Sequence, residues 1–112
     1  MSGPAKENLQ VVRGDTLTVV ANMTTDGSTP IDITARTYAM QLRTSPEATT
    51  ASATFTCTVT NAAGGVVTCT LSAATTATLT PQNYSYDLQE TNSGVVSTII
   101  SGVVKVIADT TR

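Results

Sequence analysis

The sequence predicts an all-β protein, an antiparallel β-sandwich of about seven strands with one short helical turn. The first observation is compositional: 24 of the 112 residues are threonine, and β-branched side chains fit a pleated strand better than a helix. The second is patterning, because apolar and polar residues alternate with a period of two along several runs, as in strands with one buried face. The third is spacing, since turn residues separate these runs about every eight to twelve residues, which is typical of a sandwich.

The length of the chain predicts one domain with a core of its own. Residues 1–8 are polar and include a glycine and a proline, so we expect an N-terminal arm there. Residues 9–112 are expected to form a single β-sandwich domain that begins with a short edge strand at 9–12. The tripeptide Arg13-Gly14-Asp15 is expected to bend the chain before the next strand. Cell adhesion is the weaker interpretation of one such short match.

Two further strands precede the middle of the chain. The first has Leu17, Val19, Ala21 and Met23 on its inner face, and the second has Tyr38, Met40 and Leu42 on its inner face. Between them, the segment 30–34 is expected to form a tight corner in which Asp32 and Thr34 hydrogen-bond locally to the backbone. The polar run from Ser45 to Ser52 is then expected to be a loop.

The segment from Ala53 to Ser72 predicts a β-hairpin. Apolar residues alternate with threonines on both sides of the turn at 61–65, which contains two glycines. Pairing centred on Ala63 places Val59 opposite Val67, Cys57 opposite Cys69 and Phe55 opposite Leu71. This register puts every apolar residue on one side of the hairpin and every threonine on the other, and a shift by one residue would destroy that separation.

The outward threonines of this hairpin are the candidate interface residues: Thr54, Thr56, Thr58, Thr68 and Thr70. One interpretation is a well-solvated polar face. The other is a surface that neighbouring subunits cover, because a lone sandwich usually protects its edges with charge or proline and these strands carry little of either.

The two cysteines face each other in the predicted register, so a cross-strand disulfide is geometrically conceivable. Free cysteines in a core also behave as small apolar side chains. Because residues 1–10 show no apolar signal-peptide core, folding in the reducing cytosol is expected, and we favour free thiols.

The C-terminal third predicts a helical turn and a second hairpin. Ser72 can cap a helix that runs through alanine and threonine before Pro81. Tyr84, Tyr86 and Leu88 then alternate with polar residues, and the last strand spans 95–108. Centring this hairpin on Ser93 places Tyr86 opposite Ile100 and Tyr84 opposite Gly102.

The composition argues against catalysis and against several kinds of partner. There is no histidine, and the eight carboxylates are scattered over loops and outward strand positions. Six basic residues along a chain of net charge −2 form no basic field for nucleic acid or for a membrane surface. No run of residues is long and apolar enough for a membrane span. The chain is therefore expected to be non-enzymatic, without cofactor or metal, and without nucleic-acid or membrane partners.

Five short motifs, in this order and spacing, resemble a known family: Gly14-Asp15-Thr16-Leu17-Thr18, Pro30-Ile31-Asp32-Ile33-Thr34, the segment 71–77, Tyr84-Ser85-Tyr86-Asp87-Leu88 and the segment 102–106. The chain is similar, from Leu9 to Asp109, to the small immunoglobulin-like β-sandwich found at the N-terminus of phage baseplate upper proteins and as free-standing phage structural proteins. The resemblance implies an immunoglobulin-like fold. It also implies a virion component, assembled in the host cytoplasm, that binds other phage structural proteins in many copies.

The baseplate proteins continue into a coiled coil or receptor-binding extension, which does not follow Ala108 here. The expected role is accordingly a compact accessory subunit, either a tail or baseplate adaptor or a capsid decoration protein. The alternative on the same fold is a carbohydrate- or cell-surface-binding module, which would need exposed aromatic rings. An accessory domain of an enzyme is a third, weaker hypothesis.

Overall fold

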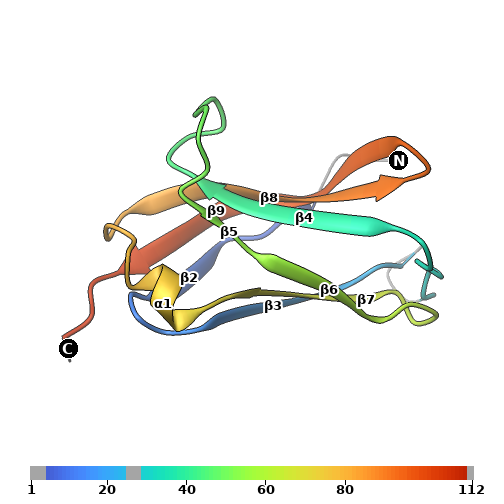
Figure 1. Cartoon of the computed structure of the whole chain (residues 1–112), viewed down its shortest axis with the longest axis horizontal. Helices are drawn as coiled ribbons and strands as arrows, with labels where there is room; N and C mark the ends of the chain where they lie inside the picture. The colour runs from blue at the N-terminus through green and yellow to red at the C-terminus, as the bar shows by residue number, and fades with distance from the viewer. Residues whose placement is uncertain (1–4, 25–28, 111–112) are drawn as a thin grey trace.

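The computed structural model of the chain, which describes residues 5–24 and 29–110, consists of two β-sheets packed face to face (Figure 1). The larger sheet contains β1 (Ala5–Lys6), β2 (Leu9–Val12), β4 (Thr37–Arg43), β5 (Ala53–Thr54), β8 (Asn83–Asn92) and β9 (Val95–Ile107). The smaller sheet has the order β3-β7-β6, with β3 (Leu17–Asn22), β6 (Thr56–Asn61) and β7 (Val66–Leu71). A short helix, α1 (Ala73–Thr76), lies at one end. The predicted all-β sandwich with one helical turn is confirmed.

The core lies between the two sheets and is built from the alternate residues that the sequence pattern selects. Buried apolar side chains include Ala21, Met40, Leu42, Val67, Leu71, Tyr84, Tyr86, Leu88, Val104 and Val106. At roughly 25 cal/mol per Å² of apolar area, burial of such side chains is the main favourable term in folding. The two sheets are therefore held together by their inner faces, and both outer faces are left available.

The central hairpin has the predicted register over most of its length. Cys57 pairs with Cys69 and Val59 pairs with Val67, as expected. Gly65 is required in the turn because its φ is +70° and an added Cβ would lie 2.6 Å from the carbonyl oxygen of Ile31. The hairpin turn is thus packed against the preceding corner.

One part of that prediction is wrong, because the strand that precedes the turn belongs to both sheets. Ala53 and Thr54 pair with β4 in the larger sheet, and the ladder with β7 begins only at Thr56. Phe55 lies at the crossing, where its N–H donates to the carbonyl of Met40 at 2.9 Å and its ring is buried. Phe55 consequently has no ladder partner on β7 and does not oppose Leu71.

The second hairpin differs from its predicted register by two residues. Its turn holds two residues with positive φ, Ser93 and Gly94, so the pairing begins with Asn92 opposite Val95. A β-bulge between Leu88 and Gln89 then shifts the register by one more residue, which gives the total difference of two. Tyr86 therefore opposes Gly102, and neither tyrosine has the partner that symmetric pairing about Ser93 predicts.

The N-terminal segment is part of the sheet in the described residues, which corrects the expectation of an arm over residues 1–8. Ala5 and Lys6 pair with β9, and the N–H of Glu7 donates to Ser101 at 3.0 Å. Residues 1–4 lie outside the described part of the chain. The pairings of β1 and β2 with β9 are parallel, whereas the other strand pairs are antiparallel. Gly102 on β9 allows the N-terminal segment to lie this close, because a Cβ added there would lie 2.1 Å from the carbonyl oxygen of Glu7.

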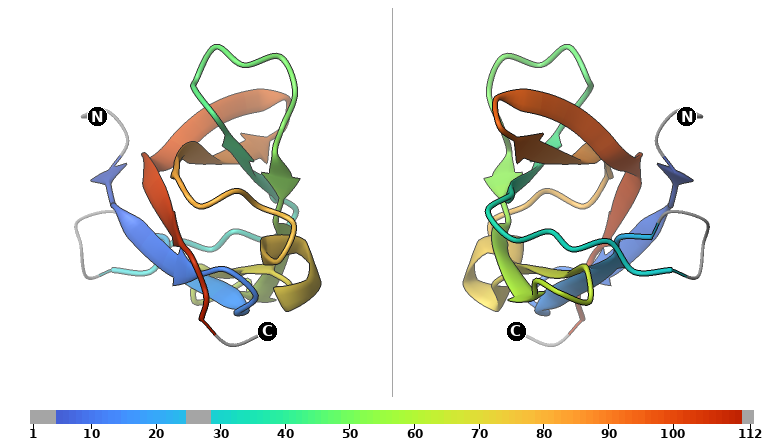
Figure 2. Two further views of the ribbon diagram at one scale, coloured as in Figure 1. Left: turned by 90° about the vertical axis from the view of Figure 1, so that its left-hand side faces the viewer. Right: turned by 90° about the vertical axis from the view of Figure 1, so that its right-hand side faces the viewer.

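The corner and the helix form as their sequences predict. Asp32 accepts hydrogen bonds from the backbone N–H and the hydroxyl of Thr34, at 3.0 and 2.6 Å, and these bonds lower the pKa of Asp32. The Ser72 side chain accepts from the N–H of Thr75 as the N-cap of α1. Thr76 is fully buried, and its hydroxyl donates to the carbonyl of Asp15 at 2.7 Å, which fixes α1 across the end of the sandwich (Figure 2).

Candidate functional site

The outer face of the smaller sheet brings together four of the five predicted interface residues. Strand pairing places Thr56, Thr70 and Thr18 in one row across the sheet, and Thr58, Thr68 and Val20 in the next. We call these six residues the threonine face. Thr18 and Val20 were not predicted, because only the pairing of β3 with β7 places them beside the hairpin. Val20 is 56% exposed, so an apolar side chain contributes to this polar surface.

The threonine face carries no charge. None of the three strands of the smaller sheet contains an acidic or basic residue. One of its hydroxyls, that of Thr68, shares a hydrogen bond of 3.2 Å with the hydroxyl of Thr60 on β6. Removing neutral hydroxyls and methyls from water costs far less free energy than removing charged groups. A partner could therefore cover this face without burying an ion.

Thr54, the fifth predicted residue, is on the other sheet. It is exposed, but it belongs to β5 and pairs with Gln41 of β4. The crossing at Phe55 separates it from Thr56, although only one residue lies between them. Inclusion of Thr54 in a single interface with the other four threonines is therefore wrong.

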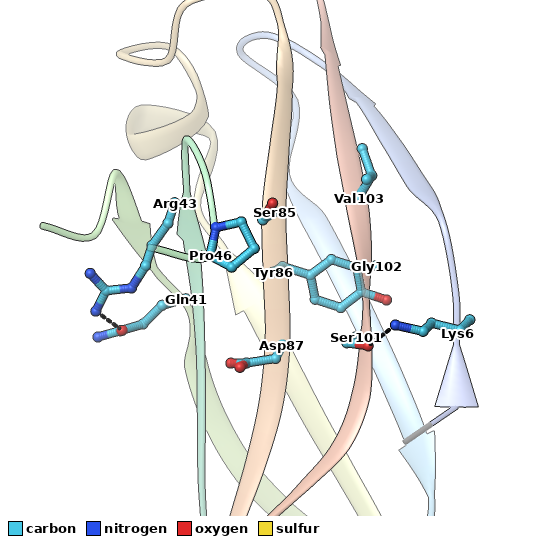
Figure 3. A pocket seen from close by; sticks show the side chains of 10 residues that line it. All are labelled: Lys6, Gln41, Arg43, Pro46, Ser85, Tyr86, Asp87, Ser101, Gly102 and Val103. Atoms are coloured by element: carbon cyan, nitrogen blue, oxygen red, sulfur yellow. Dashed lines mark hydrogen bonds between the residues drawn. The ribbon is translucent and has the colours of Figure 1, made fainter. Parts of the chain in front are cut away.

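The outer face of the larger sheet contains a hollow that the sequence did not reveal. Its volume is about 430 Å³, and Figure 3 shows Arg43 and Lys6 on opposite sides of it with Asp87 between them. Small residues on β8 and β9, among them Ser85 and Ser101, leave the space open. Lys6 reaches the hollow because β1 pairs with β9, a contact between distant parts of the sequence.

The charged groups of the hollow have mostly neutral partners. Arg43 donates to the carbonyl of Ala48 and to the Gln41 side chain, both at 2.9 Å, and thereby holds the adjoining loop. The Lys6 ammonium donates to the Ser101 hydroxyl at 3.2 Å. The hollow thus contains two basic groups, which can donate hydrogen bonds, and the carboxylate of Asp87, which can accept them. This mixture of charges favours binding of neither a simple anion nor a simple cation.

None of the four aromatic side chains is exposed. Phe55, Tyr84 and Tyr86 are buried, and Tyr38 is half-buried. Burial, assisted by the hydrogen bond to Glu90, raises the pKa of Tyr38 well above its usual value. Burial, together with the nearby charge of Glu7, raises the pKa of Tyr86 to about 12. These rings support the core and do not form a surface on which a ligand could stack.

The Arg-Gly-Asp tripeptide forms the bend that we expected. Arg13 makes an ion pair with Asp109 at 2.9 Å, and the Gly14 N–H donates to the Thr76 hydroxyl at 3.1 Å. The positive φ of Gly14, +92°, suits a glycine in this turn. These two contacts and the turn geometry of Gly14 give the tripeptide a structural role.

The cysteines are opposite each other and both are free thiols. Cys69 is fully buried, while Cys57 is half-buried. The hydrogen bond with Cys57, followed by burial, raises the pKa of Cys69 above its ordinary value. Within residues 5–24 and 29–110, no group of three or more His, Cys, Asp or Glu side chains is placed to hold a metal ion. The same residues include no helix long and apolar enough to cross a membrane.

Comparison with known proteins returned no match: no protein-family model matches the chain, and no curated protein matches it.

Proposed function

We propose that this protein is a non-enzymatic structural component of a tailed-phage virion. In this role it is an accessory subunit, present in many copies, that docks on other virion proteins as a tail or baseplate adaptor or as a capsid decoration protein. The virion context comes from the resemblance of the motifs between Leu9 and Asp109. The observation that carries the docking role is the uncharged threonine face.

The first support is energetic. A subunit that binds in many copies must have one surface whose burial is inexpensive and repeatable. The threonine face satisfies this requirement, because it is a regular array of β-branched side chains on paired strands with no ion to desolvate. Charged side chains such as Lys6, Arg43, Asp87 and Lys105 are instead on the larger sheet.

The second support is rigidity. The threonine face is held by two antiparallel ladders, and beneath it Ala21, Val67, Cys69 and Leu71 are buried. A surface fixed in this way loses little conformational entropy when a partner covers it. The threonine side chains also have few rotamers to restrict.

Mass spectrometry of purified phage particles tests the proposal directly. The protein is expected in mature virions at a stoichiometry of many copies, and its absence from them would refute the proposal. A low-resolution particle image with this subunit labelled would then distinguish head from tail.

Charge substitutions test the docking face. Thr58→Lys and Thr68→Lys are expected to reduce incorporation into particles, because each would bury an unpaired ammonium. Thr37→Lys is the matched control, since Thr37 is an exposed strand threonine on the larger sheet. Unchanged circular dichroism in all three variants would show that the fold is intact. Equal incorporation of all three would contradict the role of the threonine face.

The carbohydrate- or cell-surface-binding alternative has less support. Sugar rings commonly stack on exposed aromatic side chains, and none of the four aromatic residues is exposed. A glycan array with the purified chain would test this alternative.

A further inference from the structure

The thiols of Cys57 and Cys69 are reactive groups that the proposed docking role does not use. The two residues are partners in the ladder between β6 and β7, and both are free thiols. Because directly paired residues project from the same side of a sheet, both thiols lie on the inner face, opposite the threonine face. A partner docked on the threonine face would therefore not lie against them.

The backbone of β7 shows towards which neighbouring strand Cys69 directs its N–H and C=O groups. The carbonyl of Gly65, just before β7, accepts a hydrogen bond of 2.7 Å from the N–H of Met23, which directly follows β3. Successive residues of a strand direct their backbone groups to opposite neighbours. Counted from that carbonyl, residues 67 and 69 face β3, while residues 66, 68 and 70 face β6. Cys69 therefore forms no backbone hydrogen bond with its partner Cys57.

The backbone of β6 agrees with this alternation. The N–H of Phe55 donates to the carbonyl of Met40 on β4 at 2.9 Å, which is away from β7. The backbone groups of Cys57, two residues later, then also point away from β7. Cys57 and Cys69 are thus a non-hydrogen-bonded pair, the class in which Cα atoms lie about 4.5 Å apart and side chains are closest. A disulfide joins Cα atoms about 4.4 to 6.8 Å apart, so this pair has the spacing that the bond requires.

The two thiols differ in their access to a reagent. Among the described residues β6 is an outer strand of the smaller sheet, and Cys57 is half-buried there. Cys69 is on the middle strand and is fully buried. The hydrogen bond with Cys69 also lowers the pKa of Cys57, and the thiolate is the nucleophilic form of cysteine. Cys57 is accordingly the thiol that attacks first.

We propose that Cys57 and Cys69 form a thiol–disulfide exchange site whose substrate is a low-molecular-weight disulfide such as oxidised glutathione. The Cys57 thiolate attacks one sulfur of the glutathione disulfide, so that a mixed disulfide forms and one glutathione thiolate leaves. The sulfur of Cys69, after losing its proton, then attacks the sulfur of Cys57 and releases the second glutathione. The two cysteines are oxidised by two electrons, the glutathione disulfide is reduced to two thiols, and the two cysteine protons end on those thiols.

The second step is expected to be slower than the first, because the burial and the raised pKa of Cys69 keep it protonated. In a reducing compartment the free thiols persist, and the bond forms only where the small disulfide is in excess. Once formed, the bond joins β6 to the middle strand of the smaller sheet. The inference does not depend on the proposed virion role.

Intact-mass measurement on the full native chain tests the inference. The reduced protein is incubated with excess oxidised glutathione and is then alkylated under denaturing conditions. The expected product is a single chain lighter by about 2 Da, the mass of two hydrogens, with neither alkyl nor glutathione groups attached. Since the chain has two cysteines, that product can only contain the Cys57–Cys69 bond. Two free thiols, a persistent glutathione adduct or a disulfide between two chains would overturn the inference.

Single variants test the order of attack. Cys69→Ala is expected to stop at one glutathione on Cys57, because no second thiol can displace it. Cys57→Ala is the matched control, and it is expected to stay unmodified in the native state because Cys69 is buried. Circular dichroism checks the fold of both variants, and the mass measurement on the unmodified chain stands if either variant does not fold. Modification of Cys57→Ala at the rate of Cys69→Ala or faster would refute the assigned order.

Thermal unfolding tests whether the bond fits the ladder. The oxidised chain is expected to melt at a higher temperature than the reduced chain, because the cross-link restricts the unfolded state. Dithiothreitol should return the melting temperature to that of the reduced chain. An unchanged or lower melting temperature would show that the bond distorts the sheet, and it would overturn the fit of this pair.

Discussion

Tyr38 and Glu90 lie directly opposite each other on β4 and β8, and the phenol donates to Oε2 of the carboxylate at 2.6 Å. Glu90 is the one buried charged residue in the described chain, with a second contact to Arg36 at 3.3 Å. Both side chains point inward, where a carboxylate is tolerated only because it is paired and hydrogen-bonded. This polar cluster replaces apolar packing near the end of the sandwich from which the second hairpin continues.

Removing the Tyr38 hydroxyl should therefore lower the free energy of unfolding more than removing a tyrosine hydroxyl that is bonded to a neutral group. Tyr38→Phe is expected to lower the free energy of unfolding by about 1.5 to 3 kcal/mol, because the lost hydrogen bond is to a charged group. Tyr84→Phe is the control, since its hydroxyl donates to the neutral backbone carbonyl of Thr80, and it should cost about 0.5 to 1.5 kcal/mol. Urea unfolding measures both values. A larger loss of unfolding free energy in Tyr84→Phe than in Tyr38→Phe would contradict the stronger hydrogen bond between Tyr38 and Glu90.

The tyrosines also predict an alkaline limit to stability. The pKa of Tyr86 is raised from 10.0 to about 12 in the folded protein. A raised pKa means that the folded state favours the neutral phenol, so its contribution is complete below pH 10 and is lost as the pH rises towards 12. Thermal unfolding should show a falling melting temperature across this interval, and a smaller fall in Tyr86→Phe. If the melting temperature of Tyr86→Phe fell with pH as much as that of the unmodified protein, ionisation of Tyr86 would not be the cause of the alkaline loss of stability.

Gly102 should not tolerate a side chain. Gly102→Ala would place Cβ 2.1 Å from the Glu7 carbonyl oxygen, and we expect a loss of about 1 to 3 kcal/mol. Hydrogen exchange should accelerate at the N–H of Glu7, which donates to Ser101. Gly94→Ala is a useful comparison, because Gly94 has a positive φ and nothing within 4 Å of an added Cβ. It should be destabilised through backbone strain alone, by about 1 to 2 kcal/mol, without faster exchange at Glu7.

The two thiols should react at different rates. Cys57 is half-buried, whereas Cys69 is fully buried with a raised pKa. In the native protein a thiol reagent such as Ellman's reagent should modify one cysteine quickly, and after denaturation it should modify both. Cys57→Ala should remove the fast phase. A fast phase that persists in that variant, or the absence of any free thiol after denaturation, would contradict this arrangement.

Local patterns were sufficient to predict most strands and their buried faces. The alternation of Val59, Cys57, Val67 and Cys69 with threonine and the turn between the two runs together determined the hairpin and its register, because a shift by one residue would expose the apolar residues. The helix cap at Ser72 was predictable for a similar reason, since its geometry depends only on the three residues that follow.

Features that depend on contacts between distant segments were not predictable in the same way. No local pattern indicates that Phe55 directs the chain from one sheet to the other, or that a bulge beyond Leu88 shifts the second hairpin. Thr18 and Val20 join the threonine face only through pairing with β7, and Lys6 reaches the hollow only through pairing with β9. Both surfaces therefore depend on the order of the strands in the sheets, which local sequence patterns do not specify.

The crossing at Phe55 has a mechanical consequence. With one residue between the end of β5 and the start of β6, a force applied to the threonine face passes into the larger sheet through a taut stretch of backbone. Because only Phe55 lies between β5 and β6, no loop at that point can extend to let the two sheets separate. A pulling force is therefore shared by the hydrogen bonds of both sheets. A partner that pulls on the threonine face would therefore displace the two sheets together.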